Sequence, residues 1–171
     1  MIESRTPAPT LRVRRARPGE AACVAFLLRV AFAEVAQMYT PEALAATLAD
    51  ADAIRRRIQE GTPVWIALLN DAAVGTVSAF DRPEGLLLKS MAVHPGARGH
   101  GVARALLAAA ERFGEERGHR RVFLRTTPFL HAAIALYSRN GFTLCQGGER
   151  DLHGVPLFEM EKPLAAAGCA R

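Results

Sequence analysis

Residues 91–107 read Met-Ala-Val-His-Pro-Gly-Ala-Arg-Gly-His-Gly-Val-Ala-Arg-Ala-Leu-Leu, and this stretch decides the fold. An apolar run ends at Val93, a loop with Pro95 and Gly96 follows, and a strongly helical segment begins after Gly101. This order predicts a strand, a glycine-bearing turn and the first turn of a helix. Unpaired backbone N–H groups and the positive end of the helix dipole make such a position suitable for a phosphate group.

The glycines and arginines of this turn narrow the kind of phosphate site that it can form. Gly99 and Gly101 lack side chains, so an anion can come close to the backbone, and Arg98 and Arg104 add positive charge. The chain has no Gly-Lys-Ser/Thr of a Walker-type nucleotide site, and Arg104 stands where Gly-x-Gly-x-x-Gly needs its third glycine. The turn therefore predicts an anion site of another type, with ordinary helix-start chemistry as the alternative.

Two short motifs follow each other along the chain. Residues 98–103 have the form Arg-x-x-Gly-x-Ala, with Val-His-Pro just before them and a Leu-Leu helix just after. Residues 132–142 read Ala-Ala-Ile-Ala-Leu-Tyr-Ser-Arg-Asn-Gly-Phe. Together they resemble the acyl-CoA pyrophosphate loop and the Ala-x-x-Leu-Tyr-x-x-x-Gly-Phe element of the GNAT family of N-acetyltransferases. The resemblance is tightest over residues 85–142 and covers the rest of the chain as a pattern of elements.

The rest of the sequence predicts one α/β domain. The chain has 171 residues, half of them hydrophobic, and its patterns run in the order β-α-α-β-β-β-α-β-α-β-β. The resemblance implies the acyl-CoA N-acyltransferase fold, a single mixed, mostly antiparallel sheet with splayed central strands flanked by helices. We expect a flexible N-terminus over 1–10, the acetyltransferase domain over 11–163 and a flexible tail over 164–171.

Periodicity and turn residues give the expected elements. One helix could run from Pro41 to Glu60 or break near Asp50-Ala-Asp52. The expected strands are 11–16, 64–69, 74–80, 86–93, 121–126, 142–146 and 157–162, and the other expected helices are about 19–35, 102–117 and 130–140.

The resemblance implies acetyl-CoA as the acyl donor and assigns it to one continuous segment. The backbone of Met91, Ala92 and Val93 would hold the pantetheine arm, which pairs with exposed backbone as an added strand would. The pyrophosphate would lie against the loop and helix start, formed by Arg98, Gly99, His100, Gly101, Val102, Ala103 and Arg104.

Tyr137 is the candidate for the acid that protonates the leaving thiolate. It stands four residues before Gly141, where the family has its tyrosine, and the resemblance implies that its hydroxyl lies near the cofactor sulfur. The alternative is a helix tyrosine packed for its ring alone. The family's frequent asparagine, seven residues earlier, is Leu130 here, which removes one usual polar contact to the cofactor.

The sequence offers no clear base for the attacking amine. The two positions where family members carry a glutamate fall on Leu87 and Arg125. Glu84, with Asp81 nearby, is the nearest carboxylate and our first candidate, although a charge in a surface turn is commonly just solvated. A water chain to bulk solvent is the other route, and His131 could contact cofactor or substrate or simply be exposed.

Arg125 is the candidate substrate residue. An arginine at the substrate end of a strand could hold a carboxylate, which fits an amino-acid-like acceptor. An ion pair with Glu159 or Glu161 is the alternative.

Bulk properties exclude several function classes. The net charge of +5 suits a polyanionic cofactor, while scattered arginines and few aromatic residues argue against nucleic-acid binding. The one cluster, Arg55–Arg57, has acidic neighbours in its helix, which also argues against nucleic-acid binding. Three scattered cysteines indicate neither disulfides nor a metal site, and we see no secretory signal or membrane span.

We therefore expect a cytoplasmic enzyme that transfers an acetyl group from acetyl-CoA to a primary amine by direct attack, without a metal. The acceptor, a small-molecule amine or a peptide N-terminus, cannot be read from the sequence, and a homodimer is possible. The alternative is a GNAT-fold protein that binds acyl-CoA as a sensor or interaction module. The missing glutamates favour that alternative, and Tyr137 opposes it.

Overall fold

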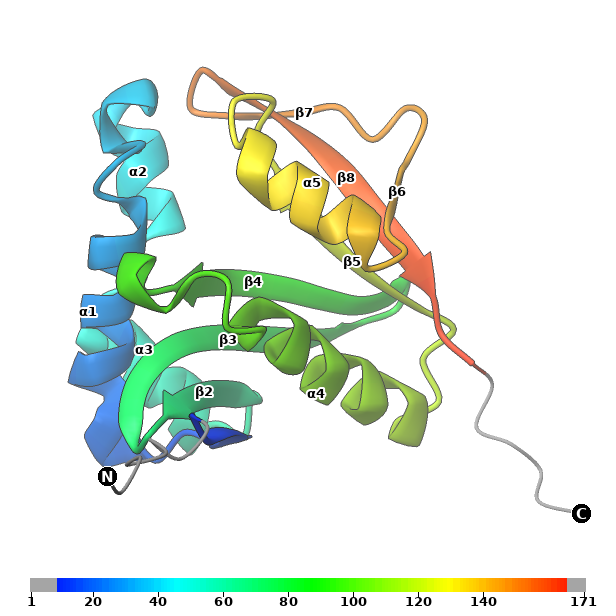
Figure 1. The fold of residues 1–171 in the computed structure, drawn as a ribbon. Coiled ribbons are helices and arrows are strands. Elements are labelled where there is room, and N and C mark those ends of the chain that lie inside the picture. The colour runs from blue at the N-terminus through cyan, green and yellow to red at the C-terminus, as the bar shows by residue number, and fades with distance from the viewer. Residues whose placement is uncertain (1–8, 166–171) are drawn as a thin grey trace, which may run out of the picture.

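A twisted sheet of eight strands forms the centre of the computed structural model, which describes residues 9–165 (Figure 1). The strand order is β1-β2-β3-β4-β5-β8-β6, and β7 pairs with β8 outside this path. All neighbours are antiparallel except β4 and β5, so the expected mixed, mostly antiparallel sheet is confirmed. The strands are β1 Leu11–Arg15, β2 Val64–Leu69, β3 Ala72–Arg82, β4 Gly85–Val93, β5 Arg121–Thr126, β6 Thr143–Leu144, β7 Arg150–Leu152 and β8 Val155–Pro163.

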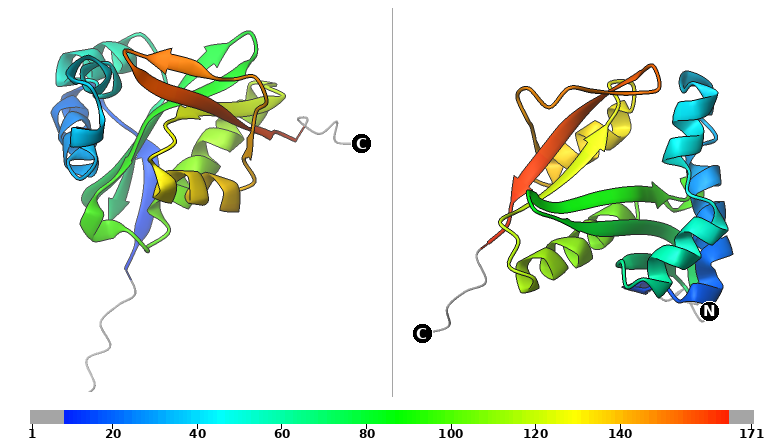
Figure 2. Two further views of the ribbon diagram at one scale, coloured as in Figure 1. Left: turned by 90° about the horizontal axis from the view of Figure 1, so that it is seen from above. Right: turned by 180° about the vertical axis from the view of Figure 1, so that it is seen from behind.

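Helices cover both faces of the sheet (Figure 2). On one face α4 buries Leu106, Leu107 and Ala110 against the strands. On the other face α1 and α3 pack Leu28 and Ile54 against the sheet. The helices are α1 Ala21–Phe32, α2 Pro41–Thr47, α3 Ala51–Gln59, α4 Val102–Glu116 and α5 His131–Arg139, with short 3-10 turns η1 Pro18–Glu20, η2 Ala36–Met38 and η3 Pro95–Ala97.

The segment 41–60 forms two helices because each has its own cap. Thr40 Oγ1 accepts a hydrogen bond from the Ala43 amide at 3.2 Å, which starts α2. Asp50 Oδ1 accepts one from Ala53 at 2.7 Å, which starts α3, so the predicted alternative of a break at this point is confirmed.

The C-terminal strands differ from the expectation. Only residues 143–144 of the expected strand 142–146 pair with β8, and the unexpected strand β7 forms a hairpin with β8. His153 and Gly154 at its turn have φ of 49° and 85°, the left-handed pair that a tight hairpin turn requires.

The central strands β4 and β5 separate after a short parallel pairing. Leu86–Leu88 pair with Val122–Leu124, and no further pairs follow. On its other edge β4 stays paired with β3, but Ser90 and Met91 together oppose Val77, a β-bulge in which Ser90 has φ of 53°. The expected splay is therefore confirmed, and it leaves the β5-facing backbone of Lys89–Val93 without a partner strand in the described sheet.

Close packing fixes the start of α4 against the sheet. A Cβ at Gly75 of β3 would lie 2.7 Å from Cγ1 of Val102, so only glycine permits this approach. The turn that precedes α4 is consequently held at the open end of the splay.

The ordered chain extends slightly past the predicted domain bounds. The Thr10 amide donates to Asn70 Oδ1 at 3.0 Å, and the Leu164 amide donates to the Arg120 carbonyl at 2.9 Å. The expectation of flexible ends otherwise falls on residues 1–8 and 166–171, which lie outside the described residues.

Candidate functional site

The turn between β4 and α4 has the geometry of an anion site. Gly99 and Gly101 have φ of 83° and 75°, and a Cβ at either would meet nothing within 4 Å, so the space over the backbone is open. Gly101 is the N-cap of α4, and no side chain caps that end of the helix. The first amides of a 15-residue helix therefore remain available, and the cradle fits a pyrophosphate.

The charged and polar side chains of this turn are mostly exposed. Arg98 Nη1 lies 2.9 Å from Glu34 Oε2, and the two side chains are 51% and 59% exposed. Arg104 and His100 are also exposed, while His94 Nδ1 accepts a hydrogen bond from the Gly96 amide at 3.1 Å. His94 therefore caps η3 rather than facing a ligand.

A cavity of about 230 Å³ lies beside this turn, where β4 and β5 have separated. It brings together the predicted residues Met91, Arg125 and Tyr137. A wider, open hollow of about 670 Å³ lies between the 144–151 segment and β8, and none of the predicted site residues lines it. The residues that line the smaller cavity are Phe32, Tyr39, Ala46, Thr47, Arg57, Leu87, Leu88, Lys89, Ser90, Met91, Leu124, Arg125, Thr126, Thr127, Leu130, Tyr137, Leu152 and Leu157.

Tyr137 is buried in the wall of this cavity, with its ring centroid 5.8 Å from that of Phe142. Burial, with a smaller contribution from Tyr39, raises the pKa of Tyr137 to about 12. The phenol therefore keeps its proton at neutral pH and can donate it. Leu130, in place of the family's asparagine, lines the same cavity with an apolar side chain.

Glu84 does not reach this cavity. It is exposed in the β3–β4 turn, at the opposite end of β4 from the glycine turn. Asp81, near the end of β3, lies 2.6 Å from His119 Nε2, a contact that lowers the pKa of this carboxyl, and Arg117 lies 3.2 Å away. His131 is exposed at the start of α5. Of the residues that the structure describes, no Asp or Glu lines the cavity, so the base role of Glu84 stays a prediction without geometric support.

Arg125 combines both of its predicted environments. It lines the cavity, and its Nε lies 3.4 Å from Oε2 of Glu159, its register partner on β8. Glu159 also contacts Arg121 at 3.3 Å. The carboxylate of Glu159 is thus shared, and the guanidinium of Arg125 keeps donors for a ligand.

Arg57 and Ser90 are cavity residues that sequence reasoning missed. Arg57 Nη1 donates to Ser90 Oγ at 2.8 Å, and burial lowers the pKa of Arg57. Arg55 pairs with its acidic neighbour Asp52 at 2.6 Å, whereas Arg57 lines the cavity. Arg57 lies three residues after the buried Ile54, and this helical spacing was the signal that it points inward.

Comparison with known proteins identifies the family. Residues 29–142 match the model of the Acetyltransferase (GNAT) family. The chain belongs to the GNAT family. This GNAT chain is 30% identical over 129 residues to the probable N-acetyltransferase family 8 member 5 of Mus musculus, covering 70% of this chain and 56% of that relative. It is 34% identical over 88 residues to N-acetyltransferase 8B of Rattus norvegicus, covering 48% and 40%. It thus spans about half the length of the curated relatives it matches.

Solved structures confirm the predicted GNAT fold. PaiA N-acetyltransferase from Thermoplasma acidophilum, in complex with coenzyme A, superposes with a TM-score of 0.75 at 16% identity, covering 90% of this chain and 99% of that one. An acetyltransferase of the GNAT family from Staphylococcus aureus Mu50 also gives 0.75, at 18% identity, covering 91% and 100%. At these identities the likeness shows the fold alone.

Two further features concern the described GNAT domain. Every helix within residues 9–165 is too short or too polar to cross a membrane. The same part of the chain brings together no group of three or more His, Cys, Asp or Glu side chains that could hold a metal ion.

Proposed function

We propose that this protein is an N-acetyltransferase that moves an acetyl group from acetyl-CoA to a primary amine by direct attack. The observation that carries the proposal is one arrangement: the uncapped, glycine-opened start of α4 lies beside the unpaired edge of β4 and a cavity with a buried tyrosine. The family match supports the same activity.

The donor site follows from the backbone. The amides from Gly99 to Arg104 bind the pyrophosphate, because they are the free N–H groups of the turn and of the helix start. The β5-facing backbone of Met91, Ala92 and Val93 binds the pantetheine arm by strand addition. Bound acetyl-CoA supplies the activated acetyl thioester that the amine attacks.

The cavity residues move protons in this proposal. Tyr137 donates its hydroxyl proton to the leaving sulfur, since its raised pKa keeps it protonated. The proton of the attacking ammonium leaves to water, because no described carboxylate lines the cavity. Sequence reasoning gave this task first to Glu84, and the Glu84→Gln variant separates the two routes.

The test is thiol release from acetyl-CoA over a panel of polyamines, amino acids, aminoglycosides and peptides with free N-termini. Turnover of at least one amine is expected.

The second candidate, an acyl-CoA-binding module, is favoured by the lack of a carboxylate in the cavity. It predicts tight binding of CoA in calorimetry with no thiol release from any amine.

Two accompanying predictions remain. We expect a cytoplasmic protein, which cell fractionation tests, and analytical ultracentrifugation decides between a monomer and the possible homodimer.

A further inference from the structure

Three cationic side chains from three different elements line the same small cavity. Arg57 comes from α3, Lys89 from β4 and Arg125 from β5. The Arg57 guanidinium and the Lys89 amine lie 5.3 and 5.8 Å from the ring centroid of Phe80, so both gather over one aromatic ring. Arg125 lies 5.8 Å from the ring of Phe123, two residues earlier on the same strand, β5.

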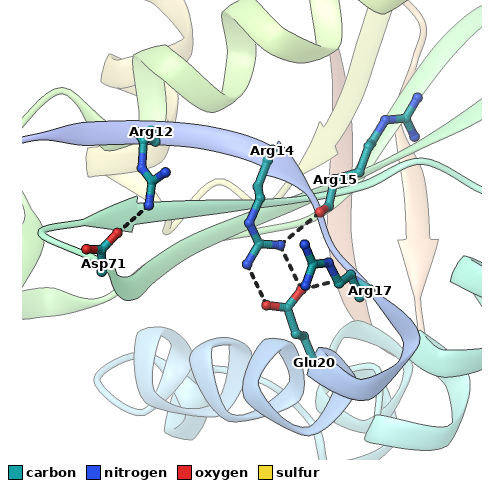
Figure 3. A network of polar contacts seen from close by, with 6 residues as sticks. All are labelled: Arg12, Arg14, Arg15, Arg17, Glu20 and Asp71. Carbon is teal, nitrogen blue, oxygen red and sulfur yellow. Dashed lines mark hydrogen bonds and ion pairs between the residues drawn. The ribbon is translucent and has the colours of Figure 1, made fainter.

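Arg57 and Lys89 lack the carboxylate partner that several other cations of the described residues have, whereas Arg125 shares Glu159 with Arg121. Figure 3 shows the contrast at the N-terminal strand, where Arg14 makes two contacts with Glu20 at 2.7 and 2.9 Å and Arg12 pairs with Asp71. Among the described residues, no carboxylate lies within 4.0 Å of the charged nitrogens of Arg57 or Lys89. The cavity therefore carries an excess of positive charge.

Holding these cations together without an anion is costly. Lys89 is exposed, yet desolvation by the atoms around it lowers its pKa, and the neighbouring charges of Arg57, Arg125 and Arg82 lower this pKa further. A bound anion would offset the repulsion among the three cations and part of the free energy lost when they are removed from water.

An unsatisfied hydroxyl in the same cavity points independently to a ligand. Thr126 is 4% exposed, and its Oγ1 has no hydrogen-bond partner among the described residues. Buried hydroxyls normally form hydrogen bonds, because a buried hydroxyl without a partner makes folding less favourable. Ser90 Oγ, by contrast, has a partner, because it accepts a hydrogen bond from Arg57 Nη1 at 2.8 Å. A polar atom of a ligand in this cavity would supply the hydrogen bond that the Thr126 hydroxyl lacks.

We infer that the acetyl acceptor is a small amine that also carries an anionic group, as an α-amino acid does, and that Arg57, Lys89 and Arg125 bind this anion. The inference rests on the proposed acetyltransferase function. A cavity of about 230 Å³ suits a molecule of this size, being below the roughly 300–1,000 Å³ of sites for drug-sized ligands.

The first experiment compares acceptors that differ only in the anion. Thiol release from acetyl-CoA is measured with L-amino acids against their C-terminal amides, and with O-phosphoethanolamine against ethanolamine. We expect kcat/KM to be about 10-fold or more higher for the anionic member, the scale of a charge-assisted hydrogen bond. A preference in only one pair identifies carboxylate or phosphate as the group recognised. Equal values within both pairs overturn the inference.

The second experiment removes the charges. Arg57→Gln and Lys89→Met should each raise KM for the anionic acceptor about 10-fold while leaving KM for its neutral partner and the Kd for CoA unchanged. Arg55→Gln, on the same helix but paired with Asp52, is the matched control and should behave as wild type. Thermal unfolding of each variant checks the fold. An unchanged acid-to-amide KM ratio in both variants contradicts the proposed contacts.

A binding measurement separates this inference from the proposed function. Calorimetry on the CoA-loaded protein compares the same acid and amide without needing turnover. If no amine releases thiol but the acid binds more tightly than the amide, the acetyltransferase proposal fails and the anion site stands. If neither binds, or both bind equally, the anion site is overturned.

Discussion

The proposed cofactor side of the site, residues 91–104, and the proposed acceptor side, formed by Arg57, Lys89 and Arg125, use different chemical groups. The cofactor side offers backbone amides at a helix start, and its arginine Arg98 is an exposed side chain in an ion pair with Glu34. The acceptor side offers charged side chains from three elements around a small cavity. Charge removal should therefore matter little on the first side and more on the second, whereas backbone access should dominate the first.

The largest effect is expected from closing the backbone cradle. Gly101→Asp puts a carboxylate against the pyrophosphate site, at a φ of 75° that aspartate tolerates. The repulsion and added bulk should raise the Kd for CoA at least about 100-fold by calorimetry. Gly101→Asn, equal in size but neutral, is the matched control and should bind CoA better than the aspartate variant. Unchanged CoA affinity in Gly101→Asp would rule out this turn as the pyrophosphate site.

Tyr137→Phe should give the next largest effect, on the chemical step. It keeps the ring and removes the hydroxyl, so kcat should fall about 100-fold while the Kd for CoA changes little. A variant as fast as wild type would leave Tyr137 with a packing role only.

The same variant tests the raised pKa of Tyr137. Because this pKa rises from 10.0 to about 12 on folding, the unfolded chain loses the proton first as pH increases. The contribution of the protonated phenol to stability is complete below pH 10 and is lost between pH 10 and about 12. Chemical denaturation across this range should show a steeper loss of stability in wild type than in Tyr137→Phe. Parallel curves would contradict the burial of the phenol.

A smaller effect is expected at Arg98. Its exposed ion pair with Glu34 indicates a weak, salt-screened charge, so Arg98→Gln should raise the Kd for CoA by less than about 10-fold. The difference from wild type should shrink as salt is added. Glu34→Gln releases Arg98 and should not weaken CoA binding. A loss as large as that of Gly101→Asp would mean that side-chain charge, not backbone, holds the cofactor.

The smallest effect is expected at Glu84. A water route predicts activity that rises with pH toward the pKa of the acceptor amine, and Glu84→Gln within about 2-fold of wild type, as for other surface positions. A dedicated carboxylate predicts a plateau well below that pKa and a large loss in the variant. A fully active variant whose profile still plateaus near neutrality would point to another group, such as His131.

The strand, glycine turn and helix start of the proposed cofactor side could be predicted from the sequence, because the residues that form them are consecutive. Residues 91–104 are consecutive, and the glycines that open the helix start are visible as residue types. The strand that precedes them and the helix that follows were also expected and are present. A site made of backbone in one turn needs no knowledge of which distant segments meet.

The acceptor side could be predicted only in part because folding assembles it. Arg125 was expected to bind substrate, but no site role was predicted for Arg57, which lies 32 residues before Lys89 in the sequence and lines the same cavity. The β7–β8 hairpin, which contributes Leu152 and Leu157, was missed because a three-residue strand carries too little alternation to detect.

The bulged residue Ser90 connects the proposed cofactor side and the proposed acceptor side through its backbone and its side chain. Its backbone belongs to the strand that continues into Met91–Val93, and its hydroxyl accepts the Arg57 hydrogen bond. A displacement of that strand on donor binding would therefore also shift the Arg57 guanidinium that we propose binds the acceptor. Thermodynamic reciprocity then requires that the factor by which the donor changes acceptor affinity equals the factor by which the acceptor changes donor affinity. Any coupling between the two proposed sites that runs through this contact depends on one hydroxyl group, so Ser90→Ala should bring that factor close to one.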